Sequence, residues 1–71
     1  MRSYIIESNN VVLEYSKTLA YAKKRSIYFH NRGFNYIKIT CLNGDYFGEG
    51  FHKYELFLIR GIDKLKWKKR V

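Results

Sequence analysis

A chain of 71 residues is long enough for one small domain, 1–71, and lies near the lower limit for folding unaided. Its formal net charge of +8 indicates a partner of opposite sign, such as nucleic acid or an acidic protein surface. A single cysteine excludes an internal disulfide and a cysteine-rich zinc site. No apolar run resembles a signal peptide or a membrane span, so we expect a cytoplasmic protein without a membrane partner.

The first fifteen residues predict a β-hairpin. Ser3–Glu7 and Val11–Tyr15 are rich in β-branched and aromatic side chains, which favour strands. Between them, Ser8-Asn9-Asn10 forms a turn, because asparagine tolerates positive φ and its side chain bonds its own backbone.

The segment Lys17–Gly33 predicts the one substantial helix of the chain. Ser16 or Thr18 can act as N-cap, with a hydroxyl that accepts from an otherwise unpaired backbone N–H. Gly33 stands where a residue in the left-handed conformation commonly ends a helix.

The predicted helix has two different faces at about 100° per residue. The face suited to lie on a sheet is small and apolar, and consists of Leu19, Ala22, Ser26 and Phe29. The opposite face is cationic and aromatic, and consists of Lys17, Tyr21, Lys24, Arg25, Tyr28 and Arg32. It holds no acid of its own, whereas an ordinary solvated face mixes charges of both signs. We therefore interpret it as a binding surface.

Alternation in Phe34–Cys41 predicts a strand after the helix. Its apolar positions Ile37, Ile39 and Cys41 point one way, and Tyr36, Lys38 and Thr40 point the other.

The pair Asn43-Gly44 is a strong hairpin signal, so Asp45–Glu49 is expected to return antiparallel. Gly48 and Gly50 predict a bulge or bend, followed by connecting chain at Phe51–Lys53.

Two segments remain near the C-terminus. Tyr54–Arg60 is a predicted strand. Lys64–Val71 is either a final strand or a basic tail, since Leu65 and Trp67 alternate with lysines, and a C-terminal helix is the competing interpretation.

These elements predict an α+β fold of order ββαβββ, with a single helix packed on one face of an antiparallel sheet. The other face stays uncovered. Because Tyr54–Ile59 is apolar at both parities, we expect a weak homodimer through the uncovered face or an edge strand.

Catalysis is not indicated. The carboxylates form no close pair in the sequence, and His30 and His52 lie on different elements without metal-type spacing. A Cys41–His52 dyad is less plausible than a buried, inert cysteine following two isoleucines. The sequence therefore predicts no enzyme, no cofactor and no metal site.

The charge distribution carries the functional prediction. Six cations and no acid lie in Tyr15–Gly44, and five more without an acid lie in Lys64–Val71. We expect nucleic-acid binding through phosphates, either DNA or RNA, with tyrosine rings available for stacking. The predicted nucleic-acid-binding residues are Lys17, Tyr21, Lys24, Arg25, Tyr28, Arg32, Lys66, Lys68, Lys69 and Arg70.

A protein–protein module is the alternative, because Tyr and Arg are enriched at interface hot spots. A small phage-type inhibitor docking on an acidic surface of a host protein belongs to this class. Abundant Lys, Asn, Ile, Tyr and Phe without proline are typical of an AT-rich genome, such as that of a phage or mobile element.

Overall fold

The computed structural model describes the backbone of residues 2–43 and 51–71 and, except at 51–53, their side chains. It is an α+β fold with one helix and a five-stranded antiparallel sheet of strand order β2-β1-β3-β4-β5, which confirms the predicted fold class and element order. The elements are β1 (Ser3–Ser8), β2 (Val11–Ser16), α1 (Leu19–Asn31), β3 (Ile37–Asn43), β4 (Phe51–Arg60) and β5 (Leu65–Arg70).

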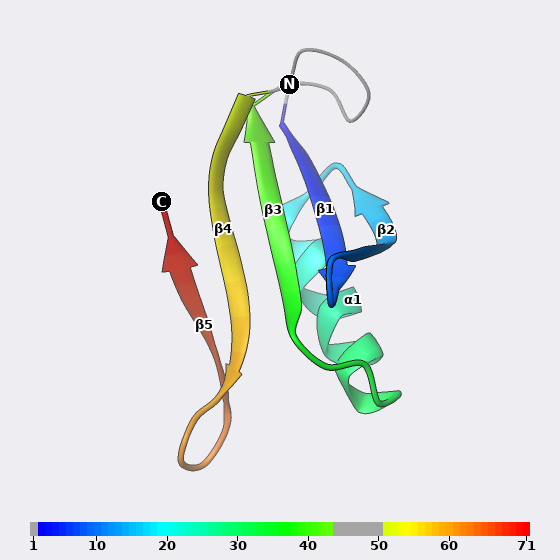
Figure 1. Ribbon diagram of the computed structural model, residues 1–71, viewed down its shortest axis with the longest axis vertical. Helices are drawn as coiled ribbons and strands as arrows, with labels where there is room; N and C mark the ends of the chain where they lie inside the picture. Colours follow the sequence, from blue (N-terminus) through cyan, green and yellow to red (C-terminus); the bar gives the residue numbers. More distant parts are fainter. Residues whose placement is uncertain (1, 44–50) are drawn as a thin grey trace.

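The helix covers only part of one sheet face. It packs on β1, β2 and β3, while β4 and β5 extend past it (Figure 1). Ala22 and Ser26 are fully buried against the sheet, and Ile6 and Ile39 are fully buried opposite them. Leu19 and Phe29 complete the predicted apolar face but are only partly buried. The sheet face away from α1 is called the open face below.

Both ends of the helix follow the predicted chemistry. The Thr18 hydroxyl accepts from the Tyr21 backbone N–H at 3.3 Å, and the Ser16 hydroxyl accepts from the Thr18 N–H at 3.0 Å. Gly33 has φ of 99°, in the left-handed region that favours glycine. Lys17 therefore precedes the helix rather than belonging to it.

The alternation predicted for β3 is confirmed, but its start is not. Ile37, Ile39 and Cys41 are buried, as expected for the face under the helix. The strand begins at Ile37 instead of Phe34, because the Phe34 ring packs edge to face on Phe29 and its N–H donates to the Phe29 carbonyl at 3.1 Å. Phe34 is thus tied to the helix end, whereas the Asn35 carbonyl accepts from the Ser8 hydroxyl of β1.

The expectation of connecting chain at Phe51–Lys53 is wrong, since β4 begins at Phe51. Backbone pairing to β3 explains this, with Phe51 opposite Asn43 and His52 opposite Leu42. The predicted turn after Asn43, the strand at 45–49 and the glycine bulge at 48 and 50 lie outside the described residues.

The last segment is a strand, and the alternatives of a tail or a C-terminal helix are wrong. β5 pairs antiparallel with β4 along its length, from Leu65 opposite Arg60 to Arg70 opposite Glu55. Gly61 opens the connecting turn, where its N–H donates to the Lys64 carbonyl at 2.8 Å. A Cβ on Gly61 would lie 2.7 Å from that same oxygen, so the turn needs glycine.

Candidate nucleic-acid interface

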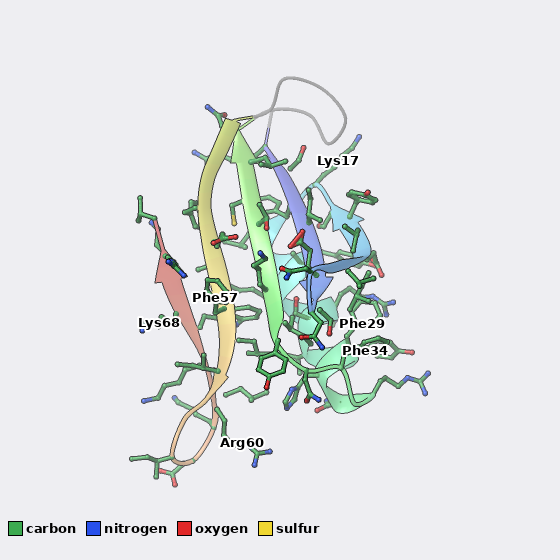
Figure 2. All side chains as sticks on the ribbon, viewed as in Figure 1. Lys17, Phe29, Phe34, Phe57, Arg60 and Lys68 are labelled. Atoms are coloured by element: carbon green, nitrogen blue, oxygen red, sulfur yellow. The ribbon has the colours of Figure 1, made fainter. Side chains whose placement is uncertain are left out.

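The two predicted basic clusters lie at opposite edges of the molecule. The cationic face of α1 adjoins β2, whereas the C-terminal cations lie on β5, and these strands are the two edges of the sheet. Four strand spacings of about 4.8 Å separate the edges by about 19 Å. Figure 2 shows Lys17 and Lys68 on the two sides accordingly. The structure therefore does not join the predicted residues into one surface.

The helix stripe, defined as Tyr21, Arg25, Tyr28 and Arg32, has an acid beside it after all. Glu14 of β2 accepts from Arg25 Nε at 3.0 Å and from the Tyr21 hydroxyl at 2.6 Å. The expectation of an acid-free surface is wrong, because the acid comes from the neighbouring strand and not from the helix. The negative charge of Glu14 thus offsets the positive charge of one of the stripe's two arginines, Arg25.

The rest of the stripe is held together by its own contacts. The Arg25 guanidinium lies 4.3 Å from the Tyr28 ring centroid, and the Arg32 guanidinium lies 5.0 Å from it. Arg32 Nη2 also donates to the Tyr28 hydroxyl at 2.6 Å. A nucleobase could stack on Tyr28 only by displacing one of these arginines. Tyr28 is consequently a poorer stacking residue than the sequence indicates.

These contacts also shift ionisation in the stripe. The hydrogen bond to Glu14 raises the pKa of Tyr21 and that of Arg25. The hydrogen bond from Arg32 lowers the pKa of Tyr28. The two tyrosines therefore differ in acidity although both are exposed.

Three β5 cations lie on the open face and form what we call the basic row: Lys66, Lys68 and Arg70. Directly opposite residues of neighbouring strands point to the same face. Lys68 is opposite Phe57, and Phe57 is opposite Lys38 on β3. Lys38 alternates with Ile37 and Ile39, which are buried under the helix, so all three of these opposite residues point to the open face. All three members of the basic row are exposed.

The remaining basic residues lie apart from this row. Lys69 Nζ is 4.5 Å from the Tyr54 ring centroid on the helix side of the sheet. Lys23 of α1 reaches over the same side, 6.0 Å from the Trp67 ring centroid. Lys17 and Lys24 are exposed on or beside the helix. Only part of the predicted β5 cluster therefore shares one face.

An ion-pair group occupies the centre of the open face. Lys38 Nζ lies 3.1 Å from Glu55 Oε2 and 3.4 Å from Glu7 Oε2. Burial disfavours the charged ammonium, but the hydrogen bond to Glu55 and the two negative charges outweigh it and raise the pKa of Lys38. The two carboxylates are thereby partly neutralised. Glu7 lies on β1, whereas Glu55 lies on β4 directly opposite Arg70 of the basic row.

Two hollows on the open face involve residues that the sequence did not single out. Phe57 lines both of them, together with Lys68, Lys69 and Arg70 in one and with Tyr36 and Asn10 in the other. In the sequence, only the alternation at Tyr36 and the apolar run containing Phe57 indicated that these residues belong to the uncovered face. Tyr36 and Phe57 line the same hollow because of the strand order, which the sequence does not provide.

Three further kinds of feature were considered in the part of the chain that the structure describes: a reactive cysteine, a metal site and a membrane-spanning helix. Cys41 is buried, and burial raises the pKa of its thiol, which disfavours the reactive thiolate. Within residues 2–43 and 51–71, no group of three or more His, Cys, Asp or Glu side chains could hold a metal ion. Across the same residues, no helix has the length and apolar character that crossing a bilayer requires.

Comparison with known proteins gives no further guide. No protein-family model, no curated protein and no solved structure matches this chain.

Proposed function

We propose that the protein binds nucleic acid and that the basic row of β5 makes the principal phosphate contacts. The observation that carries the proposal is the exposure of Lys66, Lys68 and Arg70 at alternate positions of an edge strand. Alternate residues of a strand are about 6.7 Å apart. A regular row of cations suits a regularly charged polymer, whose condensed counterions are released on binding.

Lysines on an edge strand have another use, since they prevent edge-to-edge association of sheets. The opposite edge argues against this as the whole explanation. On β2, Val11 is 62% exposed and Val12 is 43% exposed, with no lysine in the strand. The β2 edge instead has an irregular register against β1 at Ile6/Glu7 and one charged residue, Glu14. Edge protection in this protein therefore does not need a row of three cations, and their concentration on β5 supports a binding role.

The proposal is tested by titrating labelled single-stranded and duplex oligonucleotides with the protein at two salt concentrations. Three to five phosphate contacts should give a log–log slope of affinity against salt between about −2 for a single strand and about −4.5 for a duplex. Failure of every oligonucleotide to bind at low salt would contradict the proposal.

The helix stripe supports a second candidate, docking on an acidic protein surface as an inhibitor or adaptor. Its two arginines are already held against Tyr28, so little side-chain entropy remains to be lost on binding. Arg and Tyr are also the residues that most often dominate interface energies. Titration with polyglutamate, compared between the wild type and Tyr28→Ala, probes this surface: a loss of affinity in the variant supports docking, and equal affinities contradict it.

A further inference from the structure

Phe57 lies at the centre of the β4–β5 side of the open face. It is flanked by Lys38 on β3 and by Lys68 on β5, the latter labelled beside it in Figure 2. Phe57 lines both hollows of this face. An aromatic ring between a hollow and a row of cations is the arrangement that stacks a base while its phosphates are held.

A second ring stands at the far end of the same hollow. Tyr36 is 79% exposed and has φ of 55°, a left-handed conformation that bulky residues rarely adopt. It lines the same hollow as Phe57.

The rim of this hollow carries amide groups. Asn9 and Asn10, with φ of 51° and 66°, form the turn between β1 and β2 and line the hollow with Tyr36 and Phe57. Each amide offers both donors and an acceptor, the groups that pair with exposed base edges. Bases within a duplex are stacked and paired, so their faces cannot meet the two rings.

We propose that the open face is a platform for single-stranded nucleic acid. Bases stack on Phe57 and Tyr36, the asparagine amides meet base edges, and the basic row holds the phosphates. This inference rests on the proposed function and specifies its substrate class. Among the side chains that the structure describes, the face holds four cations, Lys38 and the basic row, against the carboxylates Glu7 and Glu55, both of which contact Lys38. The strand therefore follows the β4–β5 side, where the cations are in excess.

The test measures binding of a labelled oligothymidine single strand and of a hairpin duplex at low salt. Phe57→Ala and Tyr36→Ala should each weaken single-strand binding at least about fivefold with the salt slope unchanged. Phe57→Leu keeps an apolar side chain in place of the ring, so it reports stacking if the alanine variant unfolds. Phe57→Tyr should retain binding.

Two neighbouring lysines provide a comparison. Both border the hollow that Phe57 lines, but the Lys69 ammonium lies over the Tyr54 ring on the helix side of the sheet. Lys68→Ala should weaken binding and reduce the slope by about 0.7. Lys69→Ala removes the same charge from the helix side and should have a clearly smaller effect.

The outcomes separate this inference from the proposed function. If oligonucleotides bind but the Phe57 and Tyr36 variants match the wild type, the platform is wrong and the proposed function stands. Equal effects of Lys68→Ala and Lys69→Ala, or tighter binding of the duplex than of the single strand, also overturn the platform. If no oligonucleotide binds, both fail, and self-association of the wild type by sedimentation would assign the face to a second copy of the chain.

Discussion

The helix stripe beside β2 and the basic row on β5 are both cationic, yet their surroundings differ. In the stripe, Arg25 bonds Glu14 and both arginines lie against Tyr28. In the basic row, the cations stand exposed along an edge strand next to Phe57. Charges that already have partners must lose them before they bind a ligand, whereas exposed ones lose only water and counterions. Two segments with similar numbers of cations in the sequence can therefore form surfaces whose cations differ in how far they are already paired.

The largest expected effect separates packing from binding. Phe29→Ala removes a ring that contacts Phe34, Arg25 and the core, and should destabilise the protein by about 3 kcal/mol. For a domain of this size, Tm should fall by more than about 10 °C. Lys68→Ala is the control and should leave Tm unchanged in the same thermal melt. Unchanged melting of the Phe29 variant would mean that Phe29 does not belong to the packed core.

A smaller effect tests the internal partners of the stripe. The hydrogen bond to Glu14 raises the pKa of Tyr21, so its contribution to stability is present below pH 10 and is lost as pH rises further. The effect of Tyr28 on stability has the opposite pH dependence, because the hydrogen bond from Arg32 lowers the pKa of Tyr28. Its contribution to stability appears only as pH rises toward 10. In an NMR titration, Tyr28 should deprotonate before Tyr21.

The control for this titration is Glu14→Gln, which removes the carboxylate but keeps the shape of the side chain. In that variant the midpoint of Tyr21 should move down toward that of Tyr28. If Tyr21 titrates first in the wild type, Glu14 is not its partner in solution, and the contrast between the two surfaces weakens.

Much of the fold could be predicted because it depends on local signals. The asparagine turn, the helix cap at Thr18, the glycine at its end and the alternation in Ile37–Cys41 each act within a few residues. The beginning of β3 could not be predicted, because Phe34 packs on Phe29 instead of joining the sheet.

The candidate site was less predictable, since it depends on which strands become neighbours. Glu14 and Arg25 belong to different elements, and no periodicity brings them together. Phe57 and Tyr36 meet because β3 pairs with β4, and the sequence indicates only that each lies in or next to a strand. Residue types and spacing thus identified basic clusters, but not which cations were already paired.

We propose that nucleic acid binds at β5 and not at the cations on and beside α1. Two triple variants test this proposal. In the β5 variant, Lys66, Lys68 and Arg70 are changed to Gln, and in the helix variant, Lys17, Lys24 and Arg32 are changed to Gln. The two can be compared because both lower the net charge by the same amount. The measurement is the salt dependence of affinity for a labelled single strand. We predict that the β5 variant loses about 2 units of slope while the helix variant stays close to the wild type. Loss of slope in the helix variant alone, or equal loss of slope in both variants, would contradict binding at β5.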